Sequence, residues 1–198
     1  MQPTPILIIS ASPRNGSQSS KVSSVIERLL SVLNRPTRFL DIAALNLPLA
    51  GVPTESPHED LTTLQNECLN AAALVVVCPE WGGMATPSIK NALLLLTGAQ
   101  IAHKPIMLVS VSSGVGGAYP IAELRAFSSK NSHALYVPHH VIVRYVESLW
   151  VTNEKTENDL AIENRLSTAL QELIIYTDAL APHIDQLKSL RQNYRNGM

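Results

Sequence analysis

Charged residues are scarce in this chain of 198 residues: they make up 16% of it, and 15 basic side chains are balanced by 16 acidic ones. Proteins that bind nucleic acids or anionic membranes neutralise phosphates with clustered Lys and Arg. Neither the total charge of −1 nor any run in this sequence provides such a cluster. The composition therefore excludes a nucleic acid or a membrane surface as the main partner.

Cysteine is nearly absent as well. Cys68 and Cys78 are the two cysteines of the chain, and they lie too far apart in the sequence for a CxxC redox pair or a zinc site. We expect both to be reduced thiols in the core. The six histidines, including the adjacent His139 and His140, lack the spacing of metal ligands, so no metal is expected.

Long hydrophobic runs are missing too. The longest apolar stretches, residues 71–78 and 92–96, fall well short of the roughly 20 residues that cross a membrane. The start of the chain leads directly into the apolar residues 6–9, without the basic and longer apolar parts of an export signal. We therefore expect a cytoplasmic protein that folds as a single domain over residues 1–198.

Short apolar runs alternate with longer segments of helical periodicity, which is typical of a parallel sheet covered by helices on both faces. The pattern predicts strands at residues 6–10, 38–42, 73–78, 106–112 and near 141–143. It predicts helices at about residues 22–33, 59–70, 87–96, 120–129 and 157–180, with Pro182 as a point of breakage. A long loop with Pro48, Gly51, Pro53 and Pro57 follows the second strand.

This order of elements predicts an α/β fold with a doubly wound, five-stranded parallel sheet in the flavodoxin-like strand order 2-1-3-4-5. Ligands of such sheets bind beyond the carboxyl ends of strands one, three and four. Three unusual segments, residues 12–20, 79–88 and 112–117, follow those strands. We therefore expect the three segments to meet at one crevice.

The first segment is rich in phosphate-binding groups. It carries hydroxyls at Ser12, Ser17, Ser19 and Ser20, the guanidinium of Arg14, and the free N–H groups of a helix start. It lacks both GxxxxGK[ST] and GxGxxG, so a single phosphomonoester fits better than a nucleotide triphosphate or a dinucleotide. The alternative is that these residues only form the turn and cap the helix.

The second segment suits a flat ring. Gly82 and Gly83 allow a close approach of the backbone, and Trp81 can flank a planar ligand. Trp81 is equally compatible with a core or a subunit interface. The Glu80 carboxylate is open to contact with its own loop, with a partner subunit or with substrate. The alternative, more frequent for an exposed carboxylate, is that it is only solvated.

The third segment contains Gly114, Gly116 and Gly117, which expose backbone N–H groups and leave no side chain to obstruct the edge of a ligand. Backbone recognition is the functional reading of this pattern. A plain glycine-rich turn is the alternative.

The three segments together resemble the NAD(P)H-dependent FMN reductase family. The similar motifs are SPRNGS at residues 12–17, PEWGGM at 79–84 with KNA at 90–92, and SGVGG at 113–117 with LR at 124–125. The resemblance spans residues 6 to 127. Trp81 stands where the family usually has Tyr, Gly82 where it has Asn, and Leu94 and Leu95 where it has Asp and Trp.

The resemblance implies FMN as cofactor and NAD(P)H as co-substrate, with electrons passed to a small quinone, azo or flavin acceptor and no side-chain acid or base. It also implies a homodimer or homotetramer. The residues expected to bind the cofactor are Ser12, Arg14, Ser17, Gln18, Ser19, Pro79, Glu80, Trp81, Gly82, Gly83, Ser113, Gly114, Gly116 and Gly117.

Two other functions stay open at this point. One is a non-enzymatic electron carrier of the flavodoxin kind, although the nearly neutral charge argues against docking on a basic partner protein. The other is a flavin-free interaction module.

Overall fold

A parallel sheet forms the centre of the computed structural model, which describes residues 3–53 and 58–191. Its strands run in the order β2-β1-β3-β5, and the fifth position is shared by two short strands that both pair with β5. With that position counted once, the predicted order 2-1-3-4-5 is confirmed. The strands are β1 (Ile6–Ser10), β2 (Thr37–Asp41), β3 (Ala73–Trp81), β5 (Pro105–Val111), β6 (Leu135–Tyr136) and β7 (Val141–Val143).

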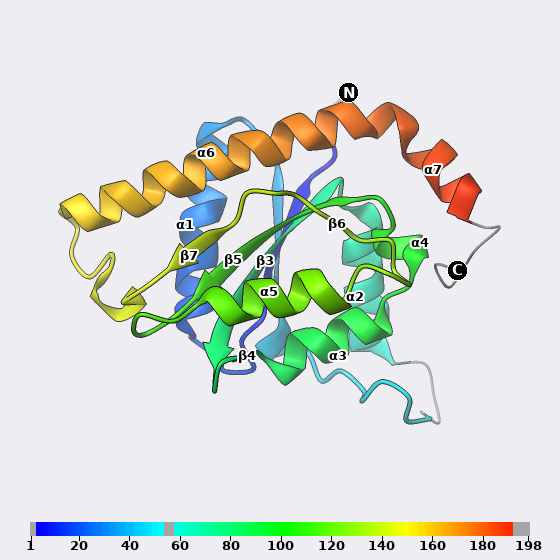
Figure 1. Cartoon of the computed structure of the whole chain (residues 1–198), viewed down its shortest axis with the longest axis horizontal. Helices are drawn as coiled ribbons and strands as arrows, with labels where there is room; N and C mark the ends of the chain where they lie inside the picture. Colours follow the sequence, from blue (N-terminus) through cyan, green and yellow to red (C-terminus); the bar gives the residue numbers. More distant parts are fainter. Residues whose placement is uncertain (1–2, 54–57, 192–198) are drawn as a thin grey trace.

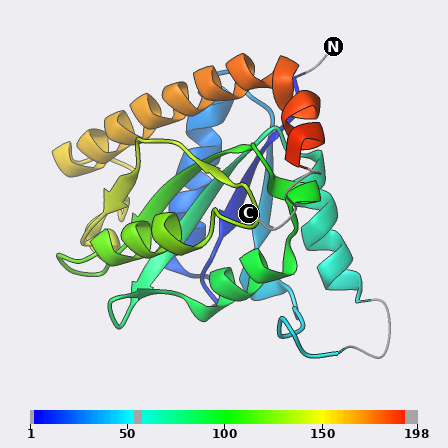
Figure 2. The same cartoon turned by 45° about the vertical axis from the view of Figure 1, so that its right-hand side comes forward.

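Helices cover both faces of the sheet (Figure 1), and the turned view in Figure 2 shows the sheet between the two helical layers. One face packs against α1 (Gln18–Val32) and α6 (Glu157–Leu180). The other packs against α2 (Glu59–Asn70), α3 (Pro87–Leu95) and α5 (Ala118–Phe127). Every residue of β1 and β5 is buried, which is why their sequences are apolar apart from Ser10 and Ser110.

The second segment differs from the prediction. Strand β3 continues past Cys78 to Trp81, and β4 (Met84–Ala85) pairs back on it in antiparallel fashion. Gly82 and Gly83, with φ of 56° and 76°, form the two-residue turn between them. A hairpin turn of this kind requires positive φ at both central residues, so the turn itself accounts for the two glycines.

Smaller differences occur at the ends of elements. Ile42 belongs to a 3₁₀ helix (Ile42–Ala44) rather than to the second strand, and Asp41 accepts the N–H of Ala43 there. Helix α4 (Gly98–Ile101) was not predicted because a helix of four residues shows no periodicity. The break at Pro182 is confirmed: it lies in a 3₁₀ turn between α6 and α7 (Ile184–Arg191). Pro57 of the predicted loop lies outside the described residues.

Both cysteines are buried and free, as predicted. Burial raises the pKa of the Cys68 thiol to about 12 and that of Cys78 to about 11, so both stay protonated at neutral pH. No cluster of potential metal ligands is found among the described residues. In the same part of the chain, no helix is both long and apolar enough to cross a membrane.

Candidate functional site

A cavity of about 570 Å³ opens where β1, β3 and β5 end, a size typical of small-molecule sites. All three sequence segments contribute to its wall, so the structure brings them together as expected. Of the expected residues, Gly83, Gly114, Gly116 and Gly117 are not among those that line it. The lining residues are Ser12, Arg14, Asn15, Gly16, Ser17, Gln18, Ser19, Pro79, Glu80, Trp81, Gly82, Val111, Ser113, Val146 and Glu147.

The first segment both caps a helix and offers unpaired groups. Ser17 is the N-cap of α1 and accepts the N–H of Ser20 at 3.1 Å, while the Ser20 hydroxyl donates to Asp41 Oδ2 at 2.8 Å. The capping alternative therefore holds for these two serines. In contrast, Ser19 Oγ and Gln18 Oε1 are buried without a hydrogen-bond partner in the described part of the chain.

Those two unpaired atoms test whether the cavity fits the expected cofactor. A buried polar atom without a partner costs free energy, so a polar ligand that satisfies it is favoured. Ser19 Oγ lies in the first turn of α1, where backbone N–H groups and the helix dipole favour an anion. Gln18 Oε1 accepts hydrogen bonds from hydroxyls. FMN carries both a phosphate and hydroxyls, and the residues present fit it.

Arg14 connects the first segment with the second. Its guanidinium lies over the Trp81 ring, 4.5 Å from the ring centroid, and its backbone N–H donates to Ser12 Oγ at 3.2 Å. Stacking leaves the edge of the guanidinium plane available for hydrogen bonds. The positive charge is thereby fixed at the wall of the cavity.

The start of α3 is tied to the end of β1. The hydroxyls of Thr86 and Ser88 both donate to the carbonyl oxygen of Ala11, at 2.7 and 2.8 Å. Asn91 accepts the N–H of Ala50 and donates to the carbonyl of Pro48. The Asn91 side chain of the KNA motif therefore fixes a neighbouring loop and does not line the cavity.

The third segment is held by Glu80. Oε2 of Glu80 accepts the N–H of Gly117 at 2.6 Å, a contact with the third segment that the sequence reading did not include, and Glu80 also lines the cavity. A Cβ on Gly116 would overlap Glu80 Oε1, and one on Gly117, where φ is 103°, would overlap Ile142 Cγ2. Internal packing and the positive φ thus require the glycine at position 117, and a side chain at position 116 would displace the Glu80 carboxylate, whereas the sequence suggested that both glycines leave room for a ligand.

One wall of the cavity was missed by the sequence reading. Val146 and Glu147 belong to a 3₁₀ helix (Val146–Ser148) after β7. Lys21 Nζ donates to the carbonyls of Val146 and Leu149 at 2.8 and 3.0 Å, and burial lowers its pKa. The available signal was position, because this segment follows the fifth parallel strand and so leaves the sheet at the same edge.

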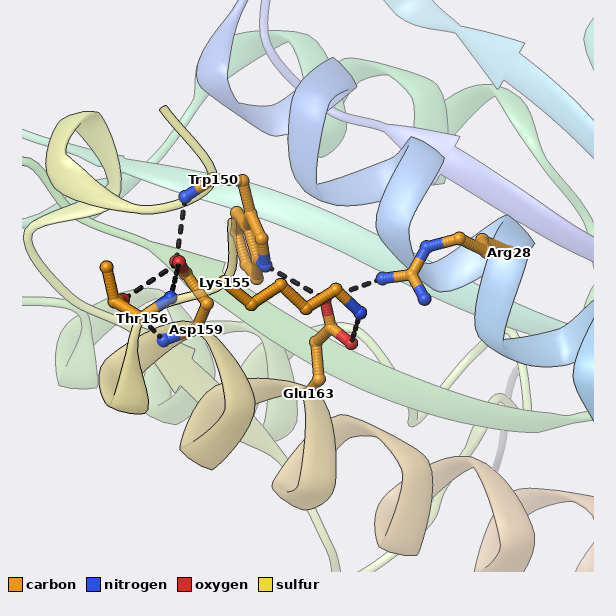
Figure 3. Close-up of polar contacts among 6 residues, drawn as sticks. All are labelled: Arg28, Trp150, Lys155, Thr156, Asp159 and Glu163. Atoms are coloured by element: carbon orange, nitrogen blue, oxygen red, sulfur yellow. Dashed lines mark hydrogen bonds and ion pairs between the residues drawn. The ribbon is translucent and has the colours of Figure 1, made fainter. Parts of the chain in front are cut away.

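Figure 3 shows how Asp159 and Glu163 of α6 bind Trp150 and Lys155, which follow the Val146–Ser148 helix in the chain. Glu163, which is 6% exposed, accepts hydrogen bonds from Arg28 at 2.6 Å, Lys155 at 2.7 Å and Trp150 Nε1 at 3.1 Å. Burial acts to raise the pKa of Glu163, but Lys155 and Arg28 outweigh it and hold that pKa below its usual value. Asp159 accepts the backbone N–H of Trp150 at 2.7 Å.

A second hollow, of about 590 Å³, lies between α3 and α5, away from the strand ends. Lys90 and Glu123 form an ion pair of 2.8 Å in its wall. Leu94 and Phe127 also line it, and these two apolar side chains are 76% and 82% exposed. An exposed apolar surface of this kind is typical of a protein interface.

The histidines lie outside the described cavity wall. None is among the described residues that line the cavity at the strand ends. His139 instead lies 3.0 Å from Glu172 of α6, through Nδ1.

Comparison with known proteins gives a family match. A family model described as NADPH-dependent FMN reductase matches residues 4–147. The chain is also 28% identical over 130 residues to an FMN-dependent NADPH-azoreductase of Staphylococcus saprophyticus, an alignment that covers 60% of this chain and 66% of that protein. The chain therefore spans just under two thirds of the length of this relative.

Solved structures share the fold. The flavoenzyme NAD(P)H:(acceptor) oxidoreductase FerB from Paracoccus denitrificans is 20% identical, with a TM-score of 0.67, and the match covers 89% of this chain and 98% of that one. An oxidoreductase from Corynebacterium diphtheriae is 15% identical, with a TM-score of 0.69, over 90% of this chain and 99% of that one. At these identities the similarity shows the flavodoxin-like fold.

Proposed function

The chain belongs to the NADPH-dependent FMN reductase family, and from this membership we propose that it binds FMN in the cavity at the strand ends and oxidises NAD(P)H. The observation that carries the proposal is the pair of buried, unpaired atoms, Ser19 Oγ and Gln18 Oε1, at the start of α1. Bound FMN supplies a group that takes up a hydride and passes electrons on. The protein binds the phosphate of FMN and positions its ring.

The proposed phosphate site is the first segment. Ser12, Ser17, Gln18 and Ser19 surround the start of α1, and the Arg14 guanidinium lies beside them in the same cavity wall. Helix N–H groups, hydroxyls and one cation are the donors that bind a phosphate monoester. The positioning contacts around Ser17 and Ser20 keep these donors in place before the ligand arrives.

The proposed ring site lies between the second and third segments. Pro79, Trp81 and Gly82 form one side, and Ser113 lies on the other. Gly83 and Gly117 serve the site indirectly through their positive φ, and Gly116 does so by leaving room for the Glu80 carboxylate.

Hydride transfer needs an accessible ligand face and no protein acid, so we assign no catalytic side chain. The acceptor we propose is a small quinone, azo or flavin compound, and the azoreductase relative supports an azo compound among these. The nearly neutral composition does not favour the alternative of an electron carrier that docks on a basic protein.

We also propose that the protein is a homo-oligomer, and that the face around the second hollow pairs with a second copy. An isologous interface must be self-complementary. This face carries both an apolar hollow and the protruding Phe127, and its charged residues are the paired Lys90 and Glu123, together with Lys130. Phe127→Asp should shift the size-exclusion elution toward the monomer, and an unchanged assembly would place the interface elsewhere.

Spectroscopy and turnover test the function directly. The purified protein, supplied with FMN and freed of excess, should show oxidised-flavin absorption that NADH or NADPH bleaches. Apoprotein should consume NAD(P)H slowly with an azo dye or a quinone, and reconstitution with FMN should restore the rate. Full activity of flavin-free protein would refute the proposal, and flavin that NAD(P)H never bleaches would point to the electron carrier.

Replacement of histidines gives a second test. Loss of a general acid or base typically costs about 10²–10⁴-fold in rate. The His139→Gln and His140→Gln variants should keep the wild-type rate at full FMN content, because neither residue lines the cavity. A collapse of that size in either variant would move the chemistry to another part of the molecule.

A further inference from the structure

The third segment, residues 113–117, is held from two sides by side chains of opposite charge. On one side, Glu80 Oε2 accepts the N–H of Gly117 at 2.6 Å. On the other, Arg144 Nε donates to the carbonyls of Val115 and Gly116 at 2.7 and 3.0 Å. The backbone donor of this segment thus faces a carboxylate, and its acceptors face a guanidinium.

Glu80 is fixed at its own end as well. It lies in the extension of β3 that pairs with β4, where Glu80 is opposite Ala85. Because a strand ladder sets the direction of its side chains, the carboxylate has a defined position against the third segment. The lack of room for a Cβ on Gly116 shows how closely Glu80 packs on that backbone.

The contact also completes a helix. Gly117 is the N-cap of α5 and has no side chain with which to cap it. The Glu80 carboxylate, which comes from another element, instead accepts the N–H of the N-cap residue itself, one of the N–H groups that the helix leaves unpaired. A negative charge is also favourable at a helix N-terminus. A hydrogen bond to an ionised acceptor is roughly twice as strong as a neutral one. One carboxylate therefore joins β3, α5 and the segment between β5 and α5.

From this geometry we propose that Glu80 is a positioning residue, which holds the third segment in the shape that flanks the flavin. The inference rests on the proposed function, because it concerns binding of the same FMN. Glu80 and Ser113 both line the cavity, so a shift of the segment changes the cavity wall. Arg144 does not line the cavity, so it can affect FMN binding only through its hydrogen bonds to the third segment.

The first measurement uses apoprotein. Hydrogen exchange of the Gly117 amide, followed by NMR, should be slow in the wild type and markedly faster in Glu80→Ala. Glu80→Gln should restore slow exchange, because the amide oxygen of Gln accepts the same hydrogen bond. Glu147→Gln is the matched control, since it neutralises another carboxylate in the same cavity that makes no described contact with Gly117.

The second measurement is FMN affinity by quenching of flavin fluorescence. The dissociation constant should rise roughly tenfold in Glu80→Ala, as expected for loss of one strong hydrogen bond. It should stay within about threefold of the wild type in Glu80→Gln. Arg144→Ala should weaken binding in the same direction as Glu80→Ala although Arg144 does not line the cavity.

Two results would overturn the inference. Wild-type affinity in Glu80→Ala would show that the segment needs no such anchor. Affinity in Glu80→Gln as weak as in Glu80→Ala, with exchange of the Gly117 amide still slow, would mean that the charge itself contacts the ligand. If the wild type bound no FMN, the proposed function would fail, and the Gly117 exchange rate would still decide whether Glu80 holds the segment. If Glu80→Ala does not fold, Glu80→Gln and Arg144→Ala carry the test.

Discussion

Arg14 lies over the face of Trp81, with its guanidinium carbon 4.5 Å from the ring centroid. The pair joins the turn after β1 to the hairpin after β3. Tryptophan is the aromatic residue best suited to hold a cation in this way. Trp81 therefore has a role beyond the interface or ligand contact considered from the sequence. It positions Arg14, the one cation among the described residues that line the cavity.

Replacement of Arg14 should weaken FMN binding. A charge-assisted hydrogen bond to phosphate contributes about 1.5–3 kcal/mol, so Arg14→Ala should raise the dissociation constant ten- to a hundred-fold. Arg14→Lys should recover part of the loss, since it keeps the charge but not the planar stack. Fluorescence titration of the apoprotein measures both. An unchanged constant in Arg14→Ala would remove the first segment from the site.

Replacement of Gly117 should destabilise the fold before it affects the ligand. The residue has a φ of 103°, and its Cβ would overlap Ile142 Cγ2, so Gly117→Val should cost about 1–3 kcal/mol or more. Gly114→Ala is the matched control, because nothing lies within 4 Å of a Cβ there. Urea unfolding of the apoproteins compares them. Equal stability of wild type and Gly117→Val would contradict the packing described for this segment.

The hydrogen bonds of Glu163 with Arg28, Trp150 and Lys155 should stabilise the segment that follows the 3₁₀ helix Val146–Ser148. Glu163→Ala removes the acceptor of three hydrogen bonds, and we expect a loss of about 2 kcal/mol and a red shift of Trp150 fluorescence. Asn164→Ala, at an exposed position of the same helix, should change stability by less than about 0.5 kcal/mol. Thermal unfolding followed by fluorescence compares the two variants. Equal losses of stability in Glu163→Ala and Asn164→Ala would argue against this hydrogen-bond network.

Lys104 should make stability depend on alkaline pH. Its ammonium is buried, donates to the carbonyls of Cys68 and Leu69, and has a pKa lowered by burial to about 8, against 10.5 for an unperturbed lysine. Between these two values the unfolded chain binds more protons than the folded one, so stability attributable to this residue rises with pH. Below pH 8 both states are protonated and the trend disappears.

A comparison of wild type with Lys104→Met isolates that effect. The free energy of unfolding of the wild type relative to the variant should increase by on the order of 2 kcal/mol from pH 8 to pH 10.5. The Cys68 thiol, whose pKa is raised to about 12, opposes the trend but is present in both proteins and cancels. Urea titrations at several pH values measure the difference. A difference that stays constant would show that Lys104 is not desolvated in solution.

The sequence was most informative where a pattern is local. The continuous apolar run of β1, the helix at Glu59–Asn70 and the break at Pro182 were all predicted, because burial on both faces, helical periodicity and the chemistry of proline act within a few residues. The family and its FMN cofactor were predicted from three motifs, and the family match confirms both. The hairpin was missed because Gly82 and Gly83 fit a ligand-binding loop as well as a two-residue turn.

The sequence by itself determined that three segments meet at one edge of the sheet, because all parallel strands end there. Only the tertiary structure decided which atoms those segments use: Glu80 for Gly117, Trp81 for Arg14, and Lys21 for the wall at Val146. Each of these side chains can reach several partners, and the partners lie far apart in the chain. Their distances follow from how the helices pack on the sheet, and no local pattern of residues contains that information.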